Sequence, residues 1–214
     1  MKDFRQNSSL TIASPQALTE LSQKEEATAL VISDSHGYAA QIFFAVKEAG
    51  KNCDALFFCG DGMSDLCLLL QKAGEDESLA ECIPPVICFV EGNCDTEYYP
   101  VKDGLIRVPL TQTVQIAGHT VLCTHGHRFS LYAGTTALEN AAQRNEADIV
   151  LYGHTHIAQS MQQGQLLIAN PGSCAKPRGG QPNCYALLKV RKNEPYPEFT
   201  VYQINPNGST PYPC

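Results

Sequence analysis

Five apolar segments of this chain have the composition of buried strands, and each leads into a polar residue that can bind a metal ion. They are ATALVIS before Asp34-Ser35-His36, DALFFCG before Asp61, PPVICFVEG before Asn93, HTVLCT before His125, and DIVLYG before His154-Thr155-His156. In an open α/β sheet, ligand sites form outside the carboxyl ends of the strands, where side chains from different strands converge. Seven ligands exceed the three or four that one zinc ion usually takes from protein. The pattern therefore predicts a two-metal hydrolytic centre.

Each of these turns also has an ordinary structural explanation when it is taken alone. Asp34 can act near a helix N-cap, and the Gly-Asp and Gly-Asn pairs at the next two strand ends are common turn dipeptides. His154 and His156 form a sharper pair, because two imidazoles that flank one small residue after a strand are uncommon by chance. Together, the ordinary explanations require five unrelated turns to place Asp, His and Asn at successive strand ends by accident. Metal binding is the better interpretation.

The kinds of ligand narrow the choice of ion. Four imidazoles with carboxylates and an amide suit manganese, iron, nickel or zinc better than calcium or magnesium. His125 continues the ligand pattern, whereas His127 is expected to line the pocket without binding metal. His119 follows Gly118 at a strand start and is expected to be structural.

The order of these blocks resembles that of the calcineurin-like metallophosphoesterases over roughly residues 28 to 204. The matching blocks are Asp34-x-His36, Gly60-Asp61, Gly92-Asn93-Cys94-Asp95, His125-Gly126-His127, Gly153-His154-Thr155-His156 and Asn170-Pro171-Gly172-Ser173. The short length and the third and last blocks look most like the small bacterial and archaeal phosphodiesterase branch. The resemblance implies an α/β fold, a four-layer α/β/β/α sandwich of two mixed sheets flanked by helices.

The resemblance also implies two divalent transition-metal ions, with manganese expected and iron, nickel or zinc as alternatives. One ion takes Asp34, His36, Asp61 and His156, and the other takes Asp61, Asn93, His125 and His154. Asp61 bridges the two ions, because its carboxylate has two equivalent oxygens. A hydroxide held between the ions then attacks the phosphorus in line, and no side-chain nucleophile is needed.

The residue after Asn93 carries information about the substrate. Many relatives have a histidine there that protonates the leaving group, whereas this chain has Cys94. A thiol with an ordinary pKa of about 8.5 is a poorer acid for an alkoxide leaving group. We therefore expect phosphodiesters with good leaving groups. Asp61, Asn93, Cys94 and His127 are the candidate catalytic residues together with Asp95, which is expected to accept a hydrogen bond from a ligating histidine.

The glycine-rich loop after the last block contains Lys176 and Arg178, which we predict to bind the substrate phosphate. A solvated turn is the alternative explanation for these two residues. The same alternative applies to Arg128, which lies beside His127.

The blocks together predict a metal-dependent phosphodiesterase acting on a small phosphodiester. A phosphomonoesterase or protein phosphatase is an alternative, made weaker by Cys94. A non-catalytic scaffold is another, because a retromer subunit of this fold binds partners after losing part of its metal site. The complete ligand set of this chain favours the enzyme.

Composition limits the class of protein further. The 214 residues are 43% hydrophobic, which suits one α/β domain with a large core. A net charge of −7 argues against extended nucleic-acid binding. No apolar stretch is long enough to resemble a membrane span, and the first residues do not resemble a signal peptide. We expect a cytoplasmic protein, with homo-oligomers an open alternative. Cys59, Cys88 and Cys123 are expected to be reduced core residues.

Three parts are expected along the chain: an N-terminal extension over residues 1–27, the metallophosphoesterase domain over residues 28–204, and a flexible tail over residues 205–214. In the extension, Ser14-Pro15 predicts the start of a surface helix packed at an edge, with a dimerisation arm as the alternative. Further helices are expected over 37–50, 63–73 and 132–146, and an acidic surface excursion over 74–84. Strands and helices alternate early and hairpins follow, which predicts two packed sheets with helices outside.

Overall fold

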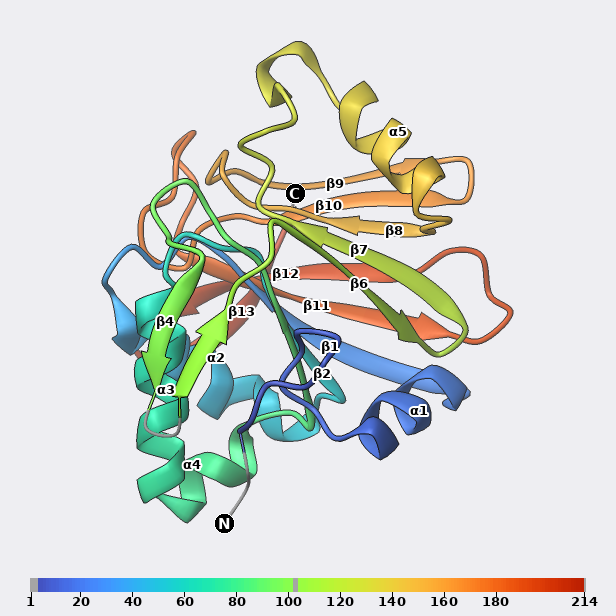
Figure 1. The fold of residues 1–214 in the computed structure, drawn as a ribbon. Helices are drawn as coiled ribbons and strands as arrows, with labels where there is room; N and C mark the ends of the chain where they lie inside the picture. Colours follow the sequence, from blue (N-terminus) through green and yellow to red (C-terminus); the bar gives the residue numbers. More distant parts are fainter. Residues whose placement is uncertain (1–3, 102–103, 214) are drawn as a thin grey trace.

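Two β-sheets pack face to face in the computed structural model, which describes residues 4–101 and 104–213 (Figure 1). The six-stranded sheet has the order β13-β12-β11-β1-β2-β3, the five-stranded sheet has the order β6-β7-β8-β10-β9, and β4 and β5 form a separate hairpin. The strands are β1 (Glu26–Ile32), β2 (Ala55–Phe58), β3 (Val86–Phe89), β4 (Tyr98–Val101), β5 (Gly104–Arg107), β6 (Thr111–Ile116), β7 (His119–Thr124), β8 (Ile149–Leu151), β9 (Ala158–Gln163), β10 (Leu166–Pro171), β11 (Cys184–Arg191), β12 (Glu198–Asn205) and β13 (Gly208–Tyr212). The helices are α1 (Pro15–Gln23), α2 (Ala39–Ala49), α3 (Met63–Glu75), α4 (Glu77–Cys82) and α5 (Thr136–Arg144), with short 3₁₀ helices η1 (Gly50–Asn52) and η2 (Leu131–Ala133).

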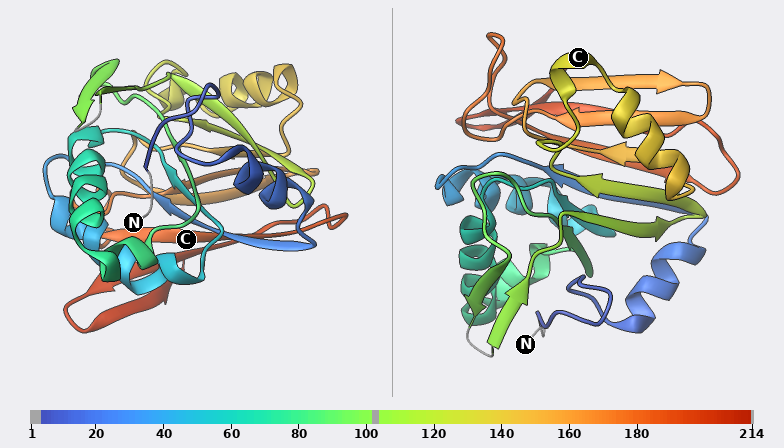
Figure 2. Two further views of the ribbon diagram at one scale, coloured as in Figure 1. Left: turned by 60° about the horizontal axis from the view of Figure 1, so that its bottom comes forward. Right: turned by 45° about the horizontal axis from the view of Figure 1, so that its top comes forward.

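Helices cover both outer faces of the pair of sheets, which makes four layers (Figure 2). Helices α2, α3 and α4 pack on the six-stranded sheet, and α5 packs on the five-stranded sheet. Strand β1 is buried on both faces, which explains its almost wholly apolar sequence. Ala29 and Val31 belong to the core between the sheets, whereas Leu30 and Ile32 belong to the core under the helices. Because successive side chains point to opposite faces, a strand buried on both faces reads as a continuous apolar run. The four-layer α/β/β/α sandwich is confirmed.

The parallel strands of each sheet end level with one another. Ile32 of β1 pairs with Phe58 of β2, and Phe58 pairs with Phe89 of β3. In the other sheet, Cys123 of β7 pairs with Leu151 of β8. The five segments that follow these strands therefore emerge at the carboxyl ends of two facing sheets, as the sequence predicts.

The N-terminal segment is packed onto the sandwich. Helix α1 begins after Ser14, whose side chain accepts a hydrogen bond from the amide of Ala17, as the Ser-Pro pair predicts. Leu21 is buried in the core between the sheets, and the helix contacts β6 and β3. The expected surface helix at an edge is confirmed.

The acidic segment 74–84 contains a short helix that was not expected, α4, which Asp76 caps by accepting hydrogen bonds from the amides of Ser78 and Leu79. Two further expectations about local structure are wrong. The helix expected over 132–146 starts at Thr136, because Gly134 has a φ of +107° that no helix accommodates. The tail over 205–214 is not flexible where the structure describes it: residues 208–212 form β13, which pairs antiparallel with β12. Pro211 is tolerated there because β13 is an edge strand.

Within residues 4–101 and 104–213, every helix is too short or too polar to cross a membrane.

Candidate metal centre

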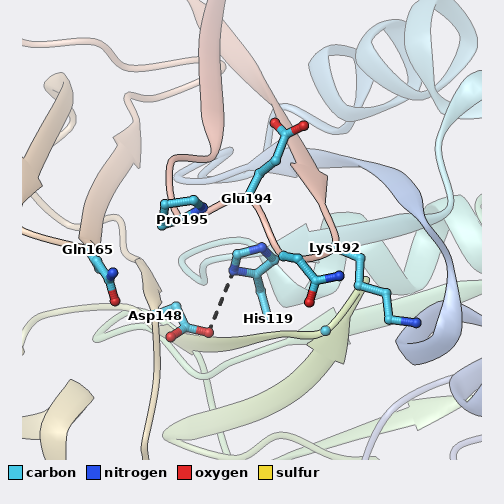
Figure 3. A pocket seen from close by; sticks show the side chains of 8 residues that line it. His119, Asp148, Gln165, Lys192, Glu194 and Pro195 are labelled. Carbon is cyan, nitrogen blue, oxygen red and sulfur yellow. Dashed lines mark ion pairs between the residues drawn. The ribbon is translucent and has the colours of Figure 1, made fainter.

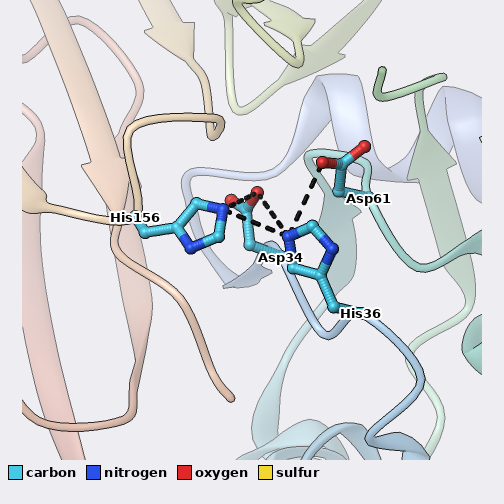
Figure 4. Close-up of side chains that lie close together, drawn as sticks. All are labelled: Asp34, His36, Asp61 and His156. Carbon is cyan, nitrogen blue, oxygen red and sulfur yellow. Dashed lines mark hydrogen bonds and ion pairs between the residues drawn. The ribbon is translucent and has the colours of Figure 1, made fainter. Parts of the chain in front are cut away.

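The first predicted ligand group assembles at the ends of β1, β2 and β8 (Figure 4). One ligand atom from each of Asp34, His36, Asp61 and His156 lies within 4.8 Å of the others. The Nε2 atoms of His36 and His156 are 3.1 Å apart, and His156 Nε2 is 3.2 Å from Asp34 Oδ1. Ligand atoms gathered this closely could hold a metal ion.

The second predicted group assembles around Asn93. Its Oδ1 is 2.9 Å from Nδ1 of His154 and 3.2 Å from Nε2 of His125. Oδ2 of Asp61 lies 3.4 Å from Nε2 of His125 and 3.6 Å from Nε2 of His36. Asp61 therefore stands between the two groups, at the position of the predicted bridge.

The carboxylate of Asp34 provides a direct test of whether an ion fits. Its Oδ2 accepts hydrogen bonds from Ser33 Oγ at 2.5 Å and from the amide of His154 at 3.1 Å. Its Oδ1 is buried without a well-formed hydrogen bond, and it faces Nε2 of His156 at 3.2 Å and Nε2 of His36 at 3.7 Å. A cation bound among this carboxylate oxygen and the two ring nitrogens would satisfy all three atoms. The donor set of imidazole and carboxylate groups fits a divalent transition-metal ion.

Hydrogen bonds to backbone carbonyls orient two of the histidines. His125 Nδ1 donates to the carbonyl of Cys59 at 2.7 Å, and His156 Nδ1 donates to the carbonyl of Lys176 at 2.6 Å. In the neutral ring, each bond places the proton on Nδ1 and leaves the lone pair on Nε2, the nitrogen that faces the carboxylates of the site. Such a second partner commonly fixes the tautomer of a metal-binding histidine.

Left-handed backbone conformations are concentrated at the predicted ligands. Positive φ angles of +47° to +68° occur at five of the seven ligand positions: Asp34, His36, Asp61, His154 and His156. Few non-glycine residues adopt this conformation, and the strain persists only where the surrounding structure imposes it. The sharp turns direct side chains from strand ends into one volume.

Two glycines allow the ligand loops to approach one another. A Cβ atom at Gly92 would lie 2.1 Å from Asp61 Oδ1, and one at Gly153 would lie 2.0 Å from Ser33 Oγ. Any larger residue would therefore displace Asp61 or the serine that holds Asp34.

The ionisable groups of the centre stabilise one another's charges. Burial opposes ionisation of Asp34, but the imidazoles of His156 and His36 outweigh it and hold the pKa of Asp34 well below its usual value. Burial lowers the pKa of His156, yet its contact with Asp34 raises that pKa overall. Asp61 and His125 behave in the same way, with the pKa of the carboxyl lowered and that of the imidazole raised. An ion would have to displace protons from these imidazoles, so metal binding should be favoured at higher pH.

The prediction that Asp95 accepts a hydrogen bond from a ligating histidine is wrong. Its carboxylate accepts no hydrogen bond from a histidine in the described part of the chain, and instead accepts backbone N–H donors from two ligand loops. The donors are Asp61 and Gly92 to Oδ2 at 2.7 and 3.0 Å, and Gly62 and Met63 to Oδ1 at 3.0 and 2.9 Å. Because α3 begins at Met63, a carboxylate also suits this helix start electrostatically. Asp95 positions the backbone of Asp61.

Cys94 and His127 lie at the border of the second ligand group. Burial and the charge of Asp61 raise the pKa of the exposed Cys94 thiol. The ring of His127 is 5.5 Å from that of His125, and its Nδ1 is buried without a hydrogen-bond partner. Burial and the charge of His125 lower the pKa of His127. His127 thus lies beside the ligands.

The predicted cations occupy the rim of the site. Lys176 and Arg178 are exposed on the loop that carries the carbonyl acceptor of His156, and the amide of Arg178 donates to the carbonyl of His156 at 3.0 Å. The Lys176 ammonium lies 5.6 Å from the centroid of the Tyr38 ring. Arg128 Nε donates to His127 Nε2 at 3.3 Å.

Sequence reasoning missed several residues that hold the ligand loops. Asp65, buried in the first turn of α3, accepts hydrogen bonds from Ser35 Oγ at 2.6 Å and from the amide of Gly37 at 2.8 Å. Ser173 Oγ donates to the carbonyl of Asp34 at 2.7 Å. Asn170 Nδ2 donates to the carbonyl of Gly153 at 2.8 Å. Asn170 and Ser173 belong to the Asn-Pro-Gly-Ser block, which matches the family pattern, but no role was predicted for them from the sequence.

His119 is structural, as expected. Its Nε2 donates to the carbonyl of Arg191 at 3.0 Å, and its Nδ1 lies 3.6 Å from Asp148 Oδ2 (Figure 3). A cavity of about 310 Å³ opens beside it, also lined by Gln165, Lys192 and Glu194. His119 begins β7 whereas His125 follows its end, so the cavity and the candidate metal centre lie at opposite ends of this strand. Cys59, Cys88 and Cys123 are buried free thiols, also as expected.

Comparisons with known proteins identify the family. Residues 28–193 match the calcineurin-like phosphoesterase superfamily domain. Phosphodiesterase YfcE of Escherichia coli K12 is 37% identical over 115 residues, a match that spans 52% of this chain and little more than half, 56%, of the relative. The probable metallophosphoesterase YsnB of Bacillus subtilis 168 is 30% identical over 165 residues, which cover 77% of this chain and 85% of YsnB. The chain belongs to the calcineurin-like phosphoesterase superfamily.

Solved structures share the fold. A predicted phosphoesterase from Streptococcus pneumoniae TIGR4 superposes with a TM-score of 0.62 at 27% identity, covering 88% of this chain and 98% of that protein. Vacuolar Protein Sorting 29 from Cryptosporidium parvum gives a TM-score of 0.66 at 18% identity, covering 88% and 97%. The second likeness concerns the fold alone.

Proposed function

We propose that this chain is a metal-dependent phosphodiesterase that hydrolyses a small phosphodiester at a centre of two divalent transition-metal ions. The observation that carries the proposal is the convergence of two ligand groups on one shared carboxylate, that of Asp61. Asp34, His36 and His156 would complete the site of one ion, and Asn93, His125 and His154 that of the other. Manganese is the proposed ion, with iron, nickel and zinc as alternatives.

Bound ions would lower the pKa of a coordinated water and offset the negative charge of the phosphate oxygens. The residues of the chain hold this arrangement in place: Asp95 fixes the backbone of Asp61, and Ser33 fixes the carboxylate of Asp34. Cys94 lies next to Asn93, at the position where many relatives have a histidine. Its raised pKa makes the thiol a weak acid. We infer a preference for leaving groups that need no protonation.

Two alternatives are distinguished by the site. A phosphomonoesterase or protein phosphatase would gain from an acid next to Asn93, where this chain has Cys94. A non-catalytic scaffold does not need a complete ligand set, and the scaffold is disfavoured because this chain has all seven of the predicted ligand residues, gathered in two groups.

The test is a metal-by-substrate screen on protein stripped of metal. Each of manganese, iron, nickel and zinc is restored separately, and hydrolysis of bis(4-nitrophenyl) phosphate is compared with that of 4-nitrophenyl phosphate. We expect activity only after metal is restored, with the higher kcat/KM for the diester. A higher value for the monoester would favour a phosphomonoesterase, and inactivity with every metal would favour the scaffold.

A further inference from the structure

The loop from Ser173 to Gln181 is fastened to both sides of the first ligand group. At its start, Ser173 Oγ donates to the carbonyl of Asp34 and accepts the amide of Lys176, both at 2.7 Å. At its end, the Gln181 side chain accepts the amide of Ala158 at 2.6 Å and donates to its carbonyl at 3.1 Å. The carbonyl of Lys176 and the amide of Arg178 also form hydrogen bonds with His156. Together, these contacts fix the loop backbone next to the candidate metal centre.

This fixed loop presents two cations that no carboxylate neutralises. Several other cations of this acidic chain form close ion pairs, such as Lys24 with Asp54 at 2.9 Å and Arg191 with Glu198 at 2.7 Å. Within residues 4–101 and 104–213, Lys176 and Arg178 have no carboxylate within 4 Å. The Lys176 ammonium lies 5.6 Å from the centroid of the Tyr38 ring, and the backbone amide of Arg178 donates a hydrogen bond to the carbonyl of His156 at 3.0 Å. Two unpaired cations are thus kept beside the ligands.

The scissile phosphate does not account for both cations. Two divalent ions together with the carboxylates of Asp34 and Asp61 and a hydroxide would carry a net charge of about +1, which already balances the single negative charge of a diester. Lys176 and Arg178 add two positive charges at the rim, where an exposed cation contributes little unless an anion binds it directly. Arginine binds phosphate with two parallel hydrogen bonds, which makes this loop suitable for a phosphate group of its own.

We propose that Lys176 and Arg178 form a second anion subsite, and that the substrate is a phosphodiester that carries a further phosphate group on one of its esters. This inference rests on the proposed phosphodiesterase function and narrows its substrate class. The further phosphate binds the loop while the diester occupies the centre.

Two esters with the same scissile bond test this proposal: the 5′-(4-nitrophenyl) ester of thymidine 5′-phosphate, and the same compound with a 3′-phosphate. We expect the 3′-phosphate to raise kcat/KM about tenfold in the manganese-loaded protein. This gain in kcat/KM should be smaller at high salt, because salt screens the attraction between the phosphate and the two cations. The double variant Lys176→Met with Arg178→Gln should lose this gain. The control Lys47→Met with Arg144→Gln removes two exposed cations that also lack a carboxylate partner, and it should keep the gain.

Calorimetry supplies a readout that does not depend on turnover. Thymidine 3′,5′-bisphosphate should bind the loaded wild type about tenfold more tightly than thymidine 5′-phosphate, and this ratio should fall to near one in the Lys176/Arg178 double variant. Equal values for the two ligands in the wild type, or a ratio that persists in the double variant, would overturn the subsite. Failure of both esters to be hydrolysed would instead count against the phosphodiesterase, and the calorimetric ratio would still decide the subsite.

Discussion

Replacing Asp61 by asparagine is expected to abolish phosphodiester hydrolysis while leaving the fold in place. The amide keeps the volume of the side chain and an oxygen that can accept the amide of Cys94, which Asp61 Oδ1 now does at 2.7 Å. It removes the charge and the second carboxylate oxygen, which lies between His36 and His125. Losing several kcal/mol of charge stabilisation corresponds to a fall in kcat/KM of at least about 10³-fold.

The folded protein should tolerate this change, because only the attractions of Asp61 to the imidazoles of His125 and His36 are lost, at a cost on the order of 1 kcal/mol each. Thermal unfolding and turnover at saturating manganese are the measurements. Asp148→Asn is the matched control, since Asp148 also faces a histidine, His119, but at the opposite ends of the strands. Turnover of Asp61→Asn equal to that of the control would show that Asp61 does not bridge two ions.

Introducing histidine at Cys94 should accelerate the hydrolysis of esters with poor leaving groups much more than those with good ones. An aryl group leaves as a fairly stable phenolate, so the missing acid costs little. An alkoxide needs protonation, and a well-placed acid typically contributes ~10²–10⁴-fold. Cys94 is exposed, so an imidazole has room there.

The measurement is kcat/KM across diesters of increasing leaving-group pKa, at matched metal occupancy. Cys94→His should flatten the dependence on leaving-group pKa, whereas the control Cys94→Ala removes the thiol without supplying an acid and should keep the dependence of the wild type. An unchanged dependence in Cys94→His would mean that this residue does not set substrate preference, and that rim contacts such as Arg178 do.

The placement of the ligands could be predicted from sequence because it follows from chain topology. Apolar runs identify the buried strands, and the carboxyl ends of parallel strands meet at one edge, so the residues after β1, β2, β3, β7 and β8 had to converge. The left-handed backbone conformation of Asp34 could not be predicted from the strand pattern, because aspartate adopts both right-handed and left-handed conformations. Asp95 illustrates a further limit: it accepts hydrogen bonds from the backbone amides of Asp61, Gly62 and Met63 in a distant loop, and backbone donors leave no side-chain signal in the sequence.

Local errors had similar causes. The segment 132–146 has the composition of one helix, yet the backbone at Gly134 delays its start, and a glycine tolerates either conformation. The tail is rich in turn residues, which predict flexibility when read alone. In the fold, Pro206-Asn207 joins β12 to β13, and Tyr212 packs against the core between the sheets. Tertiary pairing decided both cases.

The central claim is that seven side chains at the strand ends form two metal sites that share Asp61, and metal content tests it most directly. Stripped protein is loaded with manganese, freed of excess ion by gel filtration, and analysed for bound metal per chain while circular dichroism monitors the fold. The two ligand groups predict a plateau of about two ions per chain, falling in Asp61→Asn. A plateau near zero in folded wild-type protein would contradict the metal centre and the function proposed from it.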